Sequence, residues 1–209
     1  MSVATSVLPE SVAERLRASI ITQVDAPGST ITETAVALRY GVARPTARLA
    51  IDRLVADGIL RREAHRAARV PELSRDDIVD LYDNRAVLES AAIRALRSVP
   101  EDALAAHHAL TTTADFAAHD IAFHRALVAV QPSIRLARLH SLLMGEIELC
   151  IGQVQAAHLL TAAEVAQQHQ RILDAITNGN ADDAARLTRE HIIAARDALL
   201  THVDRTAHG

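Results

Sequence analysis

Short stretches of helical periodicity, separated by turn residues, make up the first third of the chain. Apolar residues recur every three to four positions over residues 11–23, which predicts a first helix. Thr32 can cap a second, short helix, which Gly41 ends. A third helix starts after Gly41 and stops at Gly58, since glycine favours the left-handed conformation at a helix end. The pattern therefore predicts three helices, with a tight turn between the last two.

Two short segments with the pattern of strands, ILRRE and AARVP, follow the third helix. They flank a charged segment at residues 64–66, which predicts a β-hairpin with charged residues at its tip. Helices followed by a hairpin in this order are typical of a winged helix-turn-helix. We assign this domain to residues 1–71.

From Ser74 onward the pattern changes to longer amphipathic helices, without the alternation that indicates strands. The helices predicted in this part cover residues 74–96, 100–110, 114–130, 132–157, 161–179 and 181–203. The fold class is therefore mainly α, with an N-terminal winged helix-turn-helix domain followed by an all-α six-helix bundle over residues 72–209.

Composition agrees with packed helices. Of the 209 residues, 49% are hydrophobic but only 2% are aromatic, so the core must consist of Leu, Ile, Val and Ala. The single cysteine, Cys150, excludes an intramolecular disulfide and fits a reducing compartment. No apolar run reaches the length of a membrane span, and the start of the chain lacks the pattern of a signal peptide. We therefore expect a cytoplasmic protein without a membrane partner.

Charge is distributed unevenly along the chain. The net charge is −4, but residues 1–70 hold 10 Arg against 7 acidic residues, whereas the remainder holds 12 Arg against 19. Every Lys or Arg position holds an arginine, so the number of arginines alone does not indicate phosphate binding. Only their positions along the chain can indicate it. Arg44, Arg48 and Arg53 lie on the third helix, opposite its apolar side. By themselves they would indicate a solvated helix face, but within a winged helix they indicate DNA binding.

Arginine side chains on a helix in the major groove can bind guanine edges or phosphates. Arg44, near the helix start, is best placed for a base, whereas Arg53 is too far along the helix. Residues at the hairpin tip can enter a neighbouring minor groove. The predicted DNA-binding residues are Arg44, Thr46, Arg48, His65 and Arg66.

Residues 33–70 resemble the DNA-binding domain of GntR-type bacterial transcription regulators. The resemblance lies in the segment ETAVALRYGVARPTARLAIDRLVADGIL, which keeps the family's spacing of Glu33, Gly41, Arg44 and Arg48. The chain departs from the family pattern at two positions. Ala43 stands where a Ser or Thr usually caps the recognition helix, and Ala67 stands where the wing usually has Gly.

Histidines are concentrated in the second domain, which holds 10 of the 11. Asp120 and His124 are four residues apart on one helix and therefore point to the same face. His169 and His191 lie about equally far from the turn at residues 179–180, so they stand at nearly the same height on two antiparallel helices. The sequence therefore predicts that these side chains meet.

A carboxylate and three imidazoles that converge inside a bundle form a suitable site for a divalent transition metal. We expect zinc first, with nickel, manganese or iron as alternatives; any one of these histidines alone would more often be a core residue. The set resembles the effector domain of the FadR subgroup, in which equivalent residues hold a metal. Its residues here are Asp120 and His124 in DIAFH, His169 in QHQRILDAI and His191 in REHIIAA; Gln168 stands where the family often has Glu.

The resemblance further implies a small carboxylate effector. Arg85, in NRAVLE, matches an arginine that lines the family's pocket, although it could instead pair with Glu89 on the helix surface. His140 is a weaker candidate for the pocket wall. Four further histidines are predicted to lie on the surface: His107, His108, His119 and His158.

Two functions fit these features. The first is a homodimeric, ligand-responsive transcriptional regulator that binds palindromic operator DNA, as a repressor or an activator. The alternative is a metal-dependent hydrolase with an accessory nucleic-acid-binding domain. No general base is evident beside the metal ligands, because Glu190 directly precedes His191 and points elsewhere. We therefore predict a regulator and not an enzyme.

Overall fold

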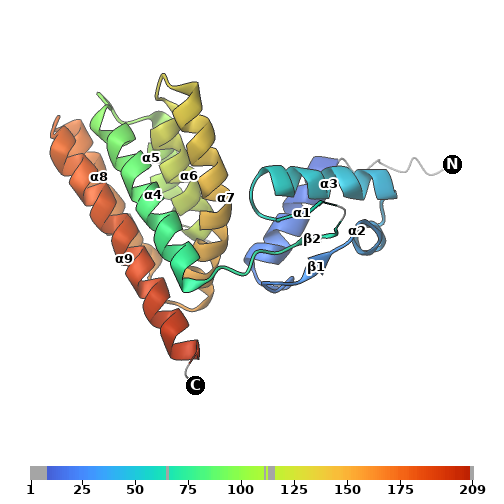
Figure 1. The fold of residues 1–209 in the computed structure, drawn as a ribbon. Coiled ribbons are helices and arrows are strands. Elements are labelled where there is room, and N and C mark those ends of the chain that lie inside the picture. Colours follow the sequence, from blue (N-terminus) through green and yellow to red (C-terminus); the bar gives the residue numbers. More distant parts are fainter. Residues whose placement is uncertain (1–8, 65, 111, 113–115, 208–209) are drawn as a thin grey trace. The chain divides into compact units, whose positions relative to one another are not determined.

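The computed structural model describes residues 9–64, 66–110, 112 and 116–207 of the chain (Figure 1). The chain divides into two compact units, residues 1–72 and residues 73–209. Among the described residues, no helix is both long enough and apolar enough to cross a membrane.

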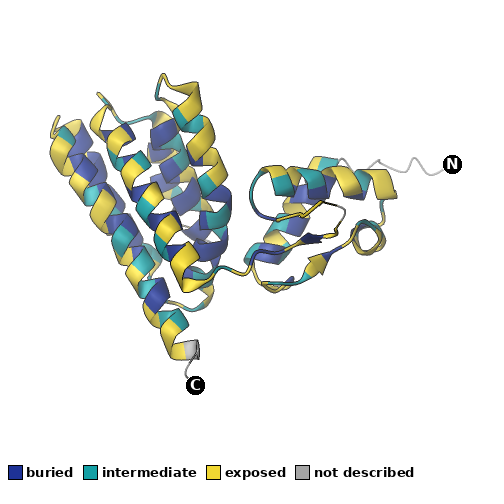
Figure 2. Ribbon diagram, in the orientation of Figure 1, coloured by how far each residue is buried: buried dark blue, intermediate teal, exposed yellow. Residues whose placement is uncertain are grey.

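The described part of the first unit consists of three helices and two very short strands. In chain order they are α1 (Pro9–Ile21), β1 (Thr30–Ile31), α2 (Glu33–Tyr40), α3 (Arg44–Ala56) and β2 (Ala68–Arg69). The apolar side of α1 packs against α3, which buries Leu16 and Ile51 completely. This packing leaves the opposite side of α3 exposed (Figure 2).

Helix ends in this unit follow the sequence signals. The Thr32 side chain accepts a hydrogen bond from the Ala35 N–H at the start of α2, and Gly41 ends that helix in the left-handed conformation with φ of 66°. Ala43 precedes α3 and makes no side-chain cap, as its methyl group dictates. The α2–turn–α3 arrangement is therefore held by Thr32 and Gly41 and not by a cap on the third helix.

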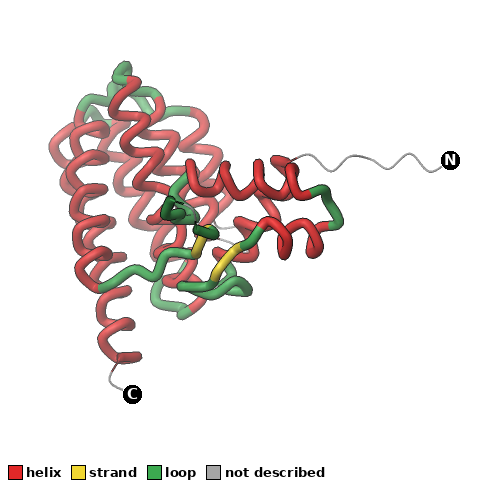
Figure 3. Tube along the Cα trace, turned by 45° about the vertical axis from the view of Figure 1, so that its right-hand side comes forward, coloured by secondary structure: helices red, strands yellow, loops and turns green. Residues whose placement is uncertain are grey.

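The predicted hairpin is only partly correct. Strand β2 pairs antiparallel with β1, so that Thr30 faces Arg69, whereas the ILRRE stretch contributes a single bridge between Arg61 and Arg69. Ile59 and Leu60 do not extend into a strand because both bond through their N–H groups to the carbonyl of Leu54 at the end of α3. Their side chains are buried there. Figure 3 shows the strands as short segments between loops.

Six helices form the second unit, as predicted, in the part of the chain that the structure describes. They are α4 (Arg75–Arg94), α5 (Glu101–Leu110), α6 (Phe116–Ala129), α7 (Ile134–Ala156), α8 (Ala162–Thr177) and α9 (Ala181–Ala207). The mainly α fold class is confirmed, and the strands among the described residues belong to the first unit.

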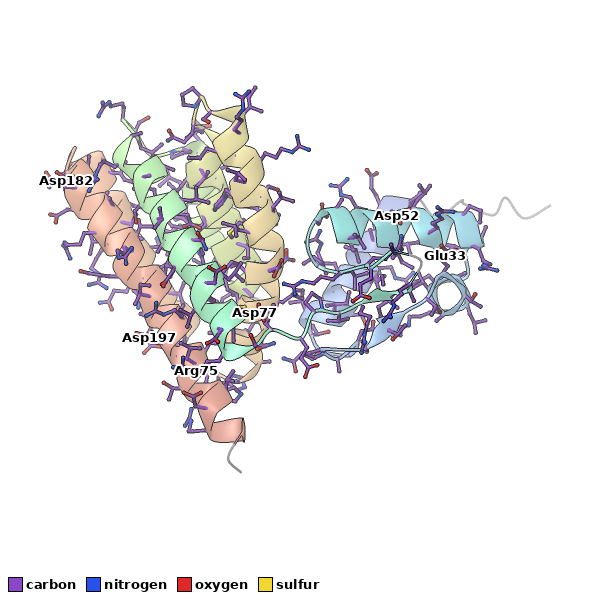
Figure 4. The ribbon with its side chains drawn as sticks, viewed as in Figure 1. Glu33, Asp52, Arg75, Asp77, Asp182 and Asp197 are labelled. Atoms are coloured by element: carbon purple, nitrogen blue, oxygen red, sulfur yellow. The ribbon has the colours of Figure 1, made fainter. Side chains whose placement is uncertain are left out.

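Helix α4 packs against α6, α7 and α9, and α8 packs against α9 (Figure 1). Capping boxes fix two starts: Ser74 with Asp77 at α4, and Thr161 with Glu164 at α8. Figure 4 labels Asp77 at the first turn of α4. The buried faces of α4, α6, α8 and α9 enclose the polar cluster described next.

Candidate metal centre and DNA-binding face

Four polar side chains from three helices meet inside the bundle. Helix α6 supplies Asp120 and His124, α8 supplies His169, and α9 supplies His191. Each offers one ligand atom, and these four atoms all lie within 4.8 Å of one another. All four residues are buried, so the helices bring together the set that their spacing along the chain predicts.

The distances within the cluster match those between the ligands of one metal ion. His124 Nε2 lies 3.0 Å from His191 Nε2, which lies 3.4 Å from His169 Nε2. Asp120 Oδ1 lies 3.1, 3.5 and 3.7 Å from Nε2 of His169, His191 and His124, respectively. Ligands about 2.0–2.1 Å from a tetrahedral ion are about 3.4 Å apart. These residues therefore fit a transition-metal ion.

Contacts outside the cluster orient the imidazole rings. Nδ1 of His191 lies 2.6 Å from Oε1 of Gln168, and the His169 ring stacks on Phe123 with centroids 3.8 Å apart. Nδ1 of His124 lies 2.5 Å from Oε2 of Glu89. A partner at the second ring nitrogen fixes the tautomer and leaves Nε2 for an ion. Gln168 supplies such a partner for His191.

In the first unit, a second candidate site lies on the exposed side of α3. The side chains of Arg44 and Arg48 are 69% and 67% exposed, and Thr46 between them is half-buried. A cavity of about 370 Å³ lies between α3, the start of α2 and the segment before β2. The residues around it include four arginines: Arg44, Arg48, Arg62 and Arg66.

Arg62 was not predicted from the sequence. Its guanidinium lies 2.5 Å from Asp52 on α3, which holds the arginine against the recognition helix. The buried Leu60 two residues earlier could have indicated the position of Arg62, because it fixes the chain at the end of α3.

His65 lies outside the described residues. Arg53 pairs with Asp57 at 3.2 Å.

Acidic side chains hold the arginines on one side of the unit. Glu33, at the start of α2, lies 3.8 Å from Arg44 and 4.0 Å from Arg48, and Asp52 lies 3.7 Å from Arg48. Figure 4 labels Glu33 and Asp52 beside this face. The resulting surface is basic, exposed and carried by a rigid helix, which suits a DNA groove.

Both units match known families. Residues 8–70 match the bacterial regulatory proteins of the gntR family, and residues 80–194 match the FCD domain, which covers more than half of the chain. The chain is a GntR-family transcriptional regulator with an FCD domain.

Two curated relatives are transcriptional regulators by name. The uncharacterized HTH-type transcriptional regulator BphR of Paraburkholderia xenovorans (strain LB400) is 28% identical and covers 88% of this chain and 82% of the relative. The probable D-xylose utilization operon transcriptional repressor of Paenarthrobacter nicotinovorans is 25% identical, over 80% of this chain and 77% of that protein.

Solved structures show the same fold. A GntR transcriptional regulator from Rhodococcus sp. RHA1 superposes with a TM-score of 0.72 at 25% identity, over 92% of this chain and 97% of the other. E. coli McbR/YncC superposes with a TM-score of 0.73 at 17% identity, over 93% of this chain and 98% of the other.

Within the FCD domain, Arg85 and Glu89 form a buried pair and not the surface pair that their spacing allows. Arg85 Nε donates to Glu89 Oε1 over 2.8 Å, and the residues are 1% and 0% exposed. Leu88 is half-buried, and Glu89 lies on the buried face of α4. The four-residue spacing of the two charges had indicated a pair on the helix surface.

Glu89 joins three helices of the FCD domain. Its Oε1 also lies 3.0 Å from Nε2 of His140 on α7, while its Oε2 contacts His124 on α6. His140 is therefore buried against a carboxylate that also orients a candidate metal ligand. This role of Glu89 was not predicted from the sequence.

Burial and neighbouring charges set the protonation states of the FCD cluster. Burial alone would raise the pKa of Asp120, but His124 and the other imidazoles lower it well below its ordinary value. The pKa of Glu89 is lowered in the same way, against its burial, by Arg85 and His124. Burial lowers the pKa of His169 to about 3 and also lowers that of His191. Both carboxylates are therefore anionic, and His169 and His191 offer free lone pairs.

The charge of His124 differs from that of the other two imidazoles. Burial lowers the pKa of His124, but the negative charges of Glu89 and Asp120 raise it by more than burial lowers it, so the net shift is upward. A proton on His124 therefore competes with an ion at this ligand.

One histidine assigned to the surface is buried. His107 on α5 lies 3.1 Å through Nε2 from Oε1 of Gln170 on α8, and only 8% of the residue is exposed. The α5–α8 contact covers it, which periodicity within α5 does not reveal. His108 and His158 are exposed and His119 is half-buried.

Proposed function

We propose that this GntR-family regulator binds a divalent metal ion in its FCD domain and responds to a small carboxylate. The response changes how a homodimer holds operator DNA. The observation that carries this proposal is the convergence of Asp120 Oδ1 and three histidine Nε2 atoms within 4.8 Å in a buried site.

Asp120, His124, His169 and His191 would hold the ion, for which zinc is the first choice and nickel, manganese or iron are alternatives. The ion supplies a buried positive charge that attracts an anionic ligand. The protein's own groups prepare the site, because Gln168 and Glu89 keep two of the imidazoles in the orientation that leaves Nε2 free.

Arg85 supports a carboxylate effector. Its Nη2 lies 3.9 Å from Oδ2 of Asp120 and has no hydrogen-bond partner among the described residues. Since Arg85 Nε is already bonded to Glu89, Nη2 remains available to an anion beside the metal ligands. In this arrangement His140 supports the effector site through Glu89.

DNA binding is assigned to Arg44, Thr46 and Arg48 on α3, with Arg66 at the following loop. The exposed side chains of Arg44, Arg48 and Arg66 around the arginine-lined cavity support this assignment, and Thr46 is half-buried between the two arginines of α3. Arg62 joins them as a phosphate-binding candidate, and His65 keeps its predicted role.

Dimerisation is assigned to the FCD domain, because a two-fold operator requires a two-fold protein. Helices α4 and α7 pack against each other and expose large apolar side chains: Val87, Ile134, Leu139 and Leu142. Exposed apolar side chains gathered on adjacent helices are typical of a protein contact surface. The proposed occupant is a second copy of the chain.

The hydrolase alternative gains no support from the site. Glu190, the carboxylate next to His191 in the sequence, is exposed and pairs with Arg186 at 2.7 Å. Its carboxylate is therefore engaged in an exposed ion pair, whereas a hydrolase would need a free general base beside the cluster.

A metal and DNA titration tests the proposal. Full-length protein should contain about one divalent ion per chain, and adding a carboxylate to the zinc-loaded dimer should shift its operator affinity. His158→Ala, at an exposed histidine, serves as the control for His169→Ala, which should lose the ion. Full metal content in His169→Ala, or operator binding indifferent to every metal and acid tried, would contradict the proposal.

A further inference from the structure

An exposed leucine lies on the outer side of helix α3. Leu49 is 57% exposed, whereas Ala50, the next residue, is fully buried. Pro45, one turn earlier, is also exposed and lies on the same face as Leu49, because residues four apart on a helix are neighbours. The exposed side of α3 in Figure 2 therefore carries a short apolar line made by Pro45 and Leu49.

This apolar line faces away from the core of the first unit. The buried residues of α3 are Ala47, Ala50, Ile51 and Leu54. Successive residues of a helix are rotated by about 100°, which puts Leu49 on the opposite side from these four. Packing within the described part of the unit therefore does not explain the leucine, and its apolar surface stays in water until a partner covers it.

Arginines beside Leu49 indicate the chemistry of that partner. Arg48 directly precedes Leu49, Arg44 lies one turn before Arg48, and their side chains are 67% and 69% exposed, respectively. Phosphates at the edges of a DNA major groove attract such side chains, and the thymine methyl is an apolar group on the floor of the groove. A protein partner at Leu49 would instead have to remove water from both arginines, which is costly unless carboxylates pair with them.

We infer that Leu49 determines part of the operator sequence by contacting the methyl group of a thymine in the major groove. This inference rests on the proposed DNA-binding face and adds a base preference that arginines do not supply, because a methyl group accepts no hydrogen bond. The thymine should lie in the same half-site as the bases that Arg44 and Arg48 contact, since all three side chains belong to one helix.

Selection from a pool of randomised DNA duplexes identifies the operator with full-length protein, in the presence and absence of zinc. Each half-site recovered by the wild type should contain a position at which thymine is preferred. Leu49→Ala shortens the side chain to Cβ and should lose this preference, while the preferences at the other positions remain. Leu38→Ala is the matched control, because Leu38 is an 85% exposed leucine of α2, and it should select the wild-type operator.

Replacing that thymine by deoxyuridine then removes the methyl group alone, without changing the hydrogen-bonding atoms of the base pair. One substitution in one half-site should weaken wild-type binding about fourfold, which is the effect of burying one methyl group. Leu49→Ala should bind the two duplexes within about twofold of each other, whereas Leu38→Ala should keep the wild-type difference. Fluorescence anisotropy measures these affinities, and thermal unfolding of each variant establishes that it is folded.

Several results would overturn the inference alone: a selected half-site without a preferred thymine, equal wild-type affinity for the thymine and deoxyuridine duplexes, or an unchanged preference in Leu49→Ala. An operator that Arg44→Ala and Arg48→Ala both bind normally would overturn the proposed DNA-binding face and this inference with it. Failure of the wild type to select any sequence would instead overturn sequence-specific DNA binding itself.

Discussion

Glu89 and His124 face each other in the interior of the FCD domain, with Glu89 Oε2 2.5 Å from His124 Nδ1. A carboxylate at the second nitrogen of an imidazole orients the ring and makes its other nitrogen a better ligand. The same carboxylate also contacts Arg85 and His140. Glu89 therefore positions a candidate metal ligand without being one itself.

Replacing Glu89 by Gln should weaken zinc binding about 10- to 100-fold while the bundle remains folded, because the amide keeps the volume but loses the charge. Competition with a fluorescent zinc chelator measures the change. Glu190→Gln, at an exposed glutamate next to His191, is the control and should bind zinc normally. Equal zinc affinity in both variants would remove the positioning role from Glu89.

The four proposed ligands should act as one unit. His169→Ala and His191→Ala should each lower metal occupancy sharply. The loss of metal affinity in the double variant should be much smaller than the sum of the two single losses. Occupancy should also fall as the pH drops through the pKa of His124, which lies above the ordinary value of 6.5, because a proton on this imidazole competes with the ion. Elemental analysis after dialysis across this pH range measures both effects. Additive losses would argue against a shared ion.

On the recognition helix, Arg44→Ala or Arg48→Ala should weaken operator binding by about 1–3 kcal/mol per half-site without unfolding the domain. Arg53→Ala is the control, because Arg53 lies on the same helix but pairs with Asp57. Fluorescence anisotropy with operator and unrelated DNA separates specific from general binding. Normal operator affinity in both test variants would show that this face does not enter the groove.

Placing negative charges on the exposed leucines of α7 tests the proposed dimer contact. Leu139→Asp combined with Leu142→Asp should produce monomers at micromolar concentration, because two buried carboxylates per subunit oppose association. Val24→Asp, at a 76% exposed apolar residue of the first unit, should leave the dimer intact. Sedimentation velocity distinguishes the two states. A dimer in the double variant would place the contact elsewhere.

Asp25 and Arg39 allow a stability prediction in the first unit. Two guanidinium nitrogens of Arg39 donate to Asp25 over 2.6 and 2.9 Å, and these bonds lower the pKa of the Asp25 carboxyl. The stabilisation is therefore present above the ordinary pKa of 3.8 and lost as the pH falls through the lower folded value.

Asp25→Asn should accordingly lower the free energy of unfolding by about 1–2 kcal/mol at pH 7, a value reduced for the exposure of Arg39. The difference from the wild type should shrink toward zero in strong acid. Urea unfolding of full-length protein, followed at several pH values, measures it. A difference that stays constant with pH would show that ionisation of Asp25 is not the cause.

Much of the fold was predictable because local signals and tertiary packing agree. Thr32, Gly41 and the capping box at Thr161 mark helix ends through bonds within a few residues. The metal candidates were also predictable, since spacing along three helices fixes both their face and their height. The failures involve residues whose surroundings come from other helices. Glu89 is a charged residue whose burial depends on partners from α6 and α7.

The strand pattern failed for a related reason. ILRRE has the composition of a strand, but hydrogen bonds from Ile59 and Leu60 to Leu54 use the backbone groups that a strand would need. The partner of β2 is instead the two-residue β1, too short to produce a periodic pattern.

His140 and Leu139 are neighbours on α7, yet one is 2% and the other 55% exposed. The first contacts Glu89 beside the candidate ligands, and the second belongs to the proposed contact between subunits. A rotation of this one helix would therefore link changes beside the candidate ligands directly to the proposed contact between subunits. The proposed effector and the proposed dimer contact would then be coupled through a single helix and not through the whole bundle.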